Sequence, residues 1–186
     1  MKVLVIPEDF RKDQHMLKPI VESMMKAKGK TAKVEVCKAP LLGGIVQALK
    51  WDRIKEIIGR YKKIDLFLLC VDRDGEANRR IRLNELELKA ADILPEGKAF
   101  LAENAWQEIE VWVLAGQRDL PSEWIWKEVR AALHPKDDYF EPFAKQHDLQ
   151  DSPGGGRKIL GERAGSNYRR IRQLCDEIKE LEQRIQ

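Results

Sequence analysis

The sequence predicts an α/β fold in which a Rossmann-like parallel sheet is flanked by helices and followed by a helical C-terminal extension. Three observations lead to this prediction. Short apolar, β-branched runs alternate with segments whose apolar residues recur at helical spacing. The run 64–71 is apolar almost throughout, which is typical of a strand buried on both faces. Strand and helix alternate from residue 2 to residue 102, and this order is the pattern of a parallel sheet.

Four strands and three helices are predicted in the first part of the chain. The Val-Leu-Val-Ile run near the N-terminus is β-branched and apolar, as strands prefer. Apolar residues at helical spacing mark each helix, and Gly or Pro residues mark where the first and third helices end. The strands are expected at 2–6, 33–37, 64–71 and 98–102, and the helices at 16–29, 54–61 and 76–94.

The pattern changes to helices after the fourth strand. Residues 108–115 alternate like a strand, but Ile109, Trp112 and Val113 also fit a helical period, and a helix is favoured. Further helices are expected at 121–133 and from 166 onward, with a glycine-rich break at 152–156.

An apolar stripe runs along the C-terminal segment. Its members recur at helical spacing, so they predict one helix docked on the body of the protein. The stripe includes Ile171, Leu174, Ile178 and Leu181. We therefore expect an α/β domain at 1–116 and a helical extension at 117–186 that packs on the same domain.

Composition places the chain among folded cytoplasmic proteins. Of 186 residues, 43% are hydrophobic and 35% are charged, which argues against a disordered chain. No apolar stretch approaches the roughly 20 residues that cross a bilayer, and the N-terminus has no secretory pattern, so no membrane contact is expected. The three cysteines are scattered and odd in number, which indicates reduced thiols.

Acidic residues follow two strands that should be neighbours in the sheet. Glu8 follows the first strand, and Asp72 and Asp74 end the third, on one side of it if the strand continues to Asp74. Carboxylates without His or Cys predict a Mg²⁺ or Mn²⁺ site. Two alternatives remain open: Asp74 caps the next helix, and Asp13 caps the first helix, although Asp13 is close enough to be a metal ligand.

Basic residues gather in one segment of an otherwise balanced chain. Between residues 157 and 172 they face a single acid, Glu162, which predicts a surface that holds a phosphate backbone without selecting sequence. They are Arg157, Lys158, Arg163, Arg169, Arg170 and Arg172.

These motifs resemble a known family. A Glu after the first strand and an Asp-x-Asp after the third resemble the Toprim domain of topoisomerases, primases and OLD-type nucleases. The segment 110–114, Glu-Val-Trp-Val-Leu, resembles an element of small stand-alone Toprim-like proteins, which in bacteria are often encoded beside an ABC-type ATPase and linked to phage defence. The resemblance covers roughly residues 1–116. Asp9 departs from it by standing where the OLD type usually has Gly, and Asp13 lies one residue further along than usual.

The resemblance implies a metal-dependent nuclease. Glu8, Asp72 and Asp74 would be catalytic and would bind Mg²⁺ or Mn²⁺, with Asp13 and Glu110 as further ligands. The implied partners are a nucleic acid, with DNA favoured over RNA, and an ABC-type ATPase. Whether the protein forms an oligomer is left open. One alternative is a non-catalytic Toprim-like subunit of an ATPase complex. A receiver-like phosphoacceptor domain is a weaker alternative, because Glu103 stands where that fold needs a Lys.

Overall fold

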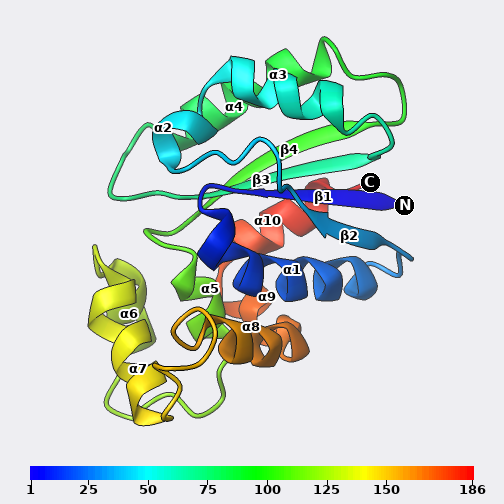
Figure 1. Ribbon diagram of the computed structural model, residues 1–186. Helices are drawn as coiled ribbons and strands as arrows, with labels where there is room; N and C mark the ends of the chain where they lie inside the picture. Colours follow the sequence, from blue (N-terminus) through cyan, green and yellow to red (C-terminus); the bar gives the residue numbers. More distant parts are fainter.

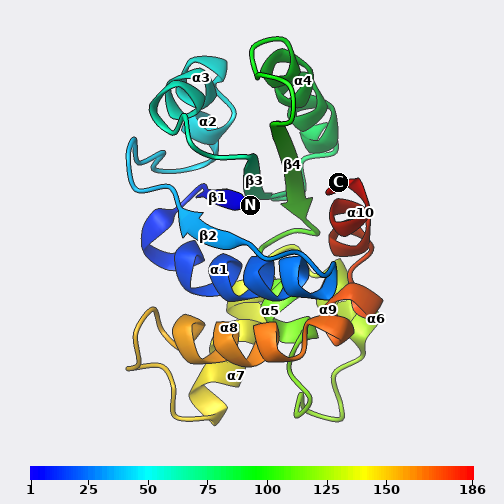
Figure 2. The same cartoon turned by 90° about the vertical axis from the view of Figure 1, so that its right-hand side faces the viewer.

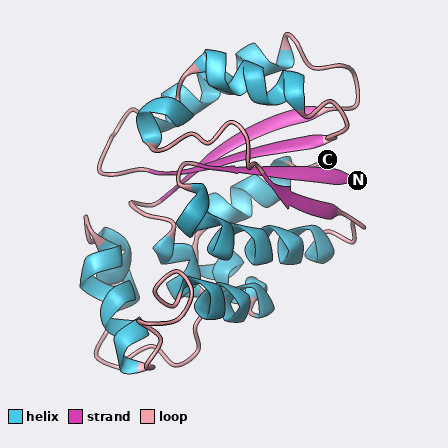
Figure 3. Ribbon diagram, in the orientation of Figure 1, coloured by secondary structure: helices cyan, strands magenta, loops and turns pink.

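The computed structural model describes residues 1–186 and shows an α/β fold around one four-stranded sheet (Figures 1 and 3). All neighbouring strands are parallel, and their order is β2-β1-β3-β4. Helices cover both faces, so the predicted α/β class with a parallel sheet is confirmed. The strands are β1 (Lys2–Pro7), β2 (Lys33–Val36), β3 (Leu66–Asp72) and β4 (Ala99–Ala105).

Side-chain alternation along the strands divides the interior into two cores. Val3 and Val5 of β1 belong to the core on one face, whereas Leu4 and Ile6 belong to the core on the other. Successive side chains of a strand point to opposite faces, so one apolar run supplies both cores. Residues 66–71 of β3 are all buried, as expected for a strand covered on both faces.

Two layers of helices enclose the sheet (Figures 1 and 2). The layer drawn above the sheet in Figure 1 consists of α2 (Ile45–Ala48), α3 (Trp51–Arg60) and α4 (Arg79–Ala91). The layer below consists of α1 (Phe10–Ala27), α5 (Glu110–Ala115), α8 (Arg157–Ser166), α9 (Tyr168–Leu174) and α10 (Asp176–Arg184). A peripheral group contains α6 (Trp126–Ala131), the π-helix η1 (Lys136–Phe140) and α7 (Glu141–Gln146). The lower core is continuous from the sheet to the C-terminal helices.

The predicted single C-terminal helix is wrong, because the chain breaks at Cys175. This residue is extended, with φ −126° and ψ 102°, and separates α9 from α10. The break frees the Leu174 carbonyl, which accepts hydrogen bonds from Trp126 Nε1 at 3.3 Å and from Arg130 Nη1 at 3.4 Å. The helices predicted at 76–94 and 121–133 are shorter in the structure, whereas the one predicted at 16–29 starts earlier, at Phe10. None of the helices combines the length and apolar character needed to cross a membrane.

The helices α1 and α8 lie side by side, and a proline in α1 shapes their contact (Figure 2). Pro19 has no backbone N–H, so the His15 carbonyl lacks its usual helical partner. Gly161 of α8 lies against this carbonyl, and a Cβ at that position would overlap the oxygen. Gly165 lies in the same way against the Pro19 carbonyl, where a Cβ would be 2.8 Å from the oxygen. Two glycines therefore set how closely α8 approaches α1.

The chain reverses its direction across the sheet between β1 and β3. From β1 the chain passes through α1 to β2 on one side, whereas from β3 it passes through α4 to β4 on the other. The carboxyl ends of β1 and β3 lie side by side, with Pro7 level with Cys70. Open α/β sheets bind ligands at such a reversal point, outside the carboxyl ends of the strands. The fold thus favours a site formed by the residues that follow these two strand ends.

Charged side chains cover the outer edge of β4. Glu87 of α4 accepts a hydrogen bond from the Ala102 N–H at 2.7 Å, and Arg80 and Arg184 donate to the Ala102 carbonyl at 2.7 and 3.0 Å. Each arginine also pairs with both Glu87 and Glu103 at 2.8 to 3.0 Å. The four side chains tie α4 and α10 to the edge strand and satisfy backbone groups that would otherwise be open to another strand.

Candidate active site

Glu8 and Asp72 meet where β1 and β3 end. Glu8 follows the last residue of β1, and Asp72 is the last residue of β3. The Asp72 N–H donates a hydrogen bond to Glu8 Oε2 at 3.3 Å. Because β1 and β3 are adjacent and parallel, their register brings these two predicted site residues together.

Asp13, in the first turn of α1, completes an acid cluster with Glu8 and Asp72. Its charge acts on Asp72, and the charge of Glu8 acts on it. Asp13 Oδ2 accepts from the Asp9 N–H at 2.9 Å, and Asp72 Oδ1 accepts from the Ile109 N–H at 2.8 Å. Each acid of the cluster thus has one oxygen held by a backbone amide. The second oxygen of each acid makes no hydrogen bond. Every buried carboxylate oxygen of the protein has a hydrogen-bond partner, so these unpartnered oxygens are not buried and contact solvent.

The acid cluster is short of positive charge. Burial raises the pKa of Glu8 to about 7, and it raises the pKa of Asp13 to about 7 as well. The pKa of Asp72 lies well above its usual range, first because of burial and then because of the neighbouring charges of Glu8, Glu110 and Asp13. Carboxylates in such surroundings bind a proton or another cation to reduce their mutual repulsion.

Asp9, rather than Asp13, caps α1. Asp9 Oδ1 accepts a hydrogen bond from the Arg11 N–H at 2.9 Å. The expectation that Asp13 is the cap is therefore wrong, because its side chain instead bonds back to the Asp9 N–H, as in a capping box. This exchange fixes the Asp13 carboxylate and leaves its other oxygen available.

Asp74 lies at the exposed edge of the acid cluster, where its charge helps to raise the pKa of Glu8 after the larger effect of burial. β3 ends at Asp72, and the N–H groups of Arg73 and Asp74 both donate to the Gln107 carbonyl, at 2.7 and 3.1 Å. This turn gives Asp74 a φ of 53° and leaves 47% of its side chain exposed, 3.8 Å from Arg79 Nη2. The predicted alternation with Asp72 is wrong because the strand does not continue. Asp74 does not cap α4 either, since another residue occupies its N-cap position.

Arg79 is the basic residue of the site, and sequence spacing does not predict it. It begins α4 and is 8% exposed, with Nη2 donating to the Arg73 carbonyl at 3.3 Å. Its charge lowers the pKa of Glu8, although burial outweighs this effect. Arg79 Nε is the one buried side-chain nitrogen or oxygen of the protein without a hydrogen-bond partner. Buried donors are normally paired, so this nitrogen is an exception inside the protein. Arg79 Nη1 makes no hydrogen bond and is not buried, so it is the nitrogen that a ligand oxygen can reach.

Glu110 is already paired, and its partner is Arg157. Arg157 Nη2 and Nε donate to Glu110 Oε1 at 2.5 and 3.0 Å, and both side chains are buried. Arg157 also lies over the Phe140 ring, 5.1 Å from its centroid. The expectation that Arg157 holds a nucleic-acid backbone is therefore wrong, because its guanidinium is inside the protein.

The other predicted basic residues do not surround the acid cluster. Arg169 and Arg172 line a hollow with Lys26, near the last turn of α1, whereas the acid cluster lies at the first turn. Arg170 Nε donates to the Gln117 carbonyl at 3.1 Å, beyond the end of α5. The basic residues of 157–172 therefore do not form one surface beside the acid cluster. Lys158 is exposed in the first turn of α8.

The cluster chemistry suits a hard divalent cation bound by few protein ligands. The five predicted ligands are not assembled, because no group of three or more His, Cys, Asp or Glu side chains is arranged to hold an ion. Mg²⁺ commonly uses only one or two carboxylates and completes its coordination with water and substrate phosphates. Glu8 is linked to the backbone N–H of Asp72, and the two carboxylates at these strand ends are enough for that mode. The five metal ligands predicted from the sequence were Glu8, Asp13, Asp72, Asp74 and Glu110.

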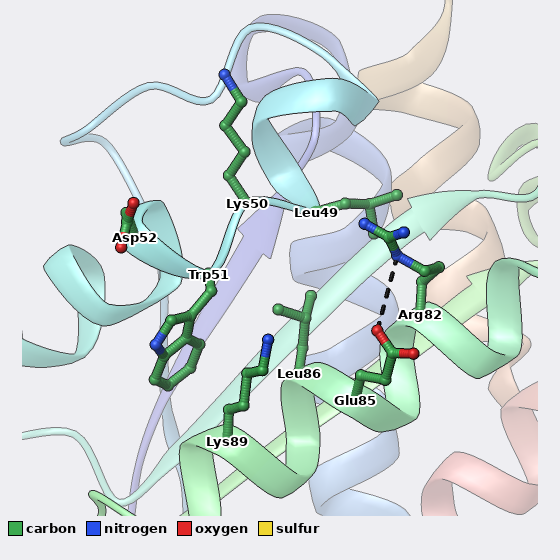
Figure 4. Close-up of a pocket in the computed structure, with 8 residues that line it drawn as sticks. All are labelled: Leu49, Lys50, Trp51, Asp52, Arg82, Glu85, Leu86 and Lys89. Atoms are coloured by element: carbon green, nitrogen blue, oxygen red, sulfur yellow. Dashed lines mark ion pairs between the residues drawn. The ribbon is translucent and has the colours of Figure 1, made fainter.

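Figure 4 shows a separate hollow of about 240 Å³ between the start of α3 and the outer face of α4. Lys50 and Lys89 lie on its rim, and Arg82 Nε pairs with Glu85 at 3.8 Å. No residue of the acid cluster lines it. The hollow is therefore distinct from the site at the carboxyl edge.

No protein-family model, curated protein or solved structure matches this chain. The function is therefore inferred from the geometry of the acid cluster and from the sequence motifs that lead to it.

Proposed function

We propose that this protein is a metal-dependent phosphodiesterase that cleaves nucleic acid, with DNA favoured over RNA. The acid cluster carries the proposal. Glu8, Asp13 and Asp72 gather at the reversal point of a parallel sheet, and each has one oxygen fixed and one open to solvent. A cation there would offset the burial and the mutual repulsion that raise the pKa of each of these carboxyl groups.

The roles follow from the contacts of each residue. Glu8 and Asp72 would hold the cation, because backbone amides orient both before any ligand arrives. When bound, a divalent cation offsets phosphate charge and makes a bound water more acidic. Asp13 adds negative charge to the site, and Arg79 offers its free Nη1 to a phosphate oxygen.

Cleavage of labelled DNA and RNA with Mg²⁺ or Mn²⁺ tests the proposal through the substitution Asp72→Asn. Asparagine keeps an oxygen that can accept from the Ile109 N–H but removes the charge. We expect activity to fall by about a hundredfold or more, as when other charge-stabilising groups are removed from active sites. Asp92→Asn is the matched control, because Asp92 is exposed at the far end of α4. Equal activity in the wild type and Asp72→Asn would overturn the assignment.

The second candidate is a non-catalytic subunit that binds an ABC-type ATPase, in a phage-defence setting that the sequence resemblance implies. The lack of three metal-ligating side chains around one point favours this candidate. Calorimetry with Mn²⁺ separates the two. Metal binding that Asp72→Asn abolishes, without cleavage of DNA or RNA alone or with the ATPase, would support the subunit and exclude the nuclease.

A further inference from the structure

A concave site lies at the opposite end of α1 from the acid cluster. It is a hollow of about 820 Å³, a size within the usual range of small-molecule sites. Asp13 of the acid cluster and Lys26 of the hollow lie on the same helix, roughly 20 Å apart at 1.5 Å per residue. The polar residues of its lining are Ser23, Lys26, Ser166, Arg169, Arg172 and Glu182.

The hollow carries unused positive charge. Lys26 and Arg169 make no side-chain hydrogen bond or ion pair within the protein, and Arg172 uses only Nε, which donates to Glu182 Oε1 at 2.8 Å. Both terminal nitrogens of Arg172 therefore remain available. Lys28 follows Lys26 closely and adds to the positive potential at this end of α1.

The single acid of the hollow is already neutralised and serves to position Arg172. The Tyr168 hydroxyl donates to Glu182 Oε2 at 2.6 Å, while Arg172 Nε occupies Oε1. Tyr168 is 5% exposed, so its ring anchors the arrangement in the core. Lys28 Nζ donates to the Glu182 carbonyl at 3.0 Å. Arg172 is thus held in the wall of the hollow before any ligand binds.

We propose that this hollow binds a ligand that carries two or more linked phosphate groups. Guanidinium groups match phosphate oxygens with pairs of parallel donors. Three cations and one acid line the hollow and give it a net charge of +2, so a ligand with more than a single negative charge fits it best. The free hydroxyl of Ser23 adds a neutral donor. The phosphates come either from a free nucleotide or from the backbone of a nucleic acid whose remaining length reaches away from the acid cluster.

Binding measured without divalent metal tests this site independently of cleavage. The probes are inorganic tripolyphosphate, ATP and adenosine by calorimetry, and a labelled single-stranded DNA by anisotropy. We expect tripolyphosphate to bind and adenosine not to bind. ATP that binds better than DNA identifies a nucleotide source, whereas tight binding of DNA identifies a backbone source. Asp72→Asn should bind like the wild type, so failure of the proposed nuclease would not affect this result.

Paired variants decide whether the hollow is the site. Arg169→Gln/Arg172→Gln should weaken tripolyphosphate binding roughly tenfold or more, because it removes charge-assisted bonds. Lys158→Gln/Arg163→Gln removes the same charge from exposed positions of α8 outside the hollow and should have little effect. Arg169→Gln alone covers the case in which loss of Arg172 disturbs the fold. Absence of binding in the wild type, or equal losses in both double variants, would overturn the proposal.

Discussion

At the scale of single residues, the acid cluster makes stability depend on pH. Glu8 and Asp13 have a pKa of about 7 in the folded protein, against usual values of 4.5 and 3.8. Between these values the folded state binds more protons than the unfolded state, so the free energy of unfolding should fall as pH rises toward about 7 and then level off. Denaturant unfolding with a metal chelator, from about pH 5 to about pH 8, measures this slope.

Addition of metal and removal of one negative charge should each counter this loss of stability. Above about pH 7, Mn²⁺ should raise the midpoint of unfolding, because it binds the folded state in place of the lost protons. Asp72→Asn should flatten the pH profile, since it removes one of the repelling charges while keeping the acceptor for Ile109. A profile in which stability rises with pH, or one that Mn²⁺ leaves unchanged, would contradict the account of the cluster.

Sequence spacing predicts part of this site for a clear reason. Glu8 and Asp72 end adjacent parallel strands, so their meeting follows from strand order alone. Asp74 could not be placed, because the turn is fixed by a distant carbonyl, that of Gln107. The burial of Arg157 and Arg79 was equally hidden, since arginines are rarely buried and their partners lie elsewhere in the chain.

At the scale of elements, dense apolar patterns predict the type of element correctly, and the ambiguous segment 108–115 forms the helix that its 3.6-residue period favours, α5. The four strands and α1 carry dense apolar patterns, and each appears close to its predicted position. α8 was not predicted, because its contact face consists of small residues rather than large apolar ones. Gly161, Ala164 and Gly165 form that face, and hydrophobic spacing does not detect it.

The close contact between α1 and α8 can be tested with Gly161→Ala. The new Cβ would overlap the His15 carbonyl, which is backbone and cannot turn away, so we expect a loss of about 1–3 kcal/mol in the free energy of unfolding. Gly59→Ala is the matched control: Gly59 is helical, and nothing lies within 4 Å of its added Cβ. That variant should be neutral or gain up to about 1 kcal/mol. Equal effects in urea unfolding would show that the contact tolerates a larger residue.

At the scale of the whole molecule, the C-terminal helix α10 covers one edge of the sheet. β4 is an edge strand, and α10 reaches it from the far end of the sequence through Arg184. The apolar residues Ile178 and Leu181 bury the helix in the lower core, while Arg184 joins Arg80 at the strand. Sequence periodicity indicates the buried stripe but not this ion-pair network, which joins residues far apart in the chain.

Arg184→Ala tests whether the network protects the edge. It leaves Glu103, which is 4% exposed, with one cationic partner instead of two, and it removes a donor to the Ala102 carbonyl. Arg184 is partly exposed, so we expect a loss of about 1–3 kcal/mol, below the cost of breaking a fully buried pair. Arg60→Ala, which breaks an exposed pair with Glu56, should change stability by about 0.5 kcal/mol or less.

Because unpaired edge strands associate, Arg184→Ala should also form larger species in size-exclusion chromatography as its concentration rises, and Arg60→Ala should not. Equal stability and identical elution of the two variants would show that α10 covers β4 without the help of its charges.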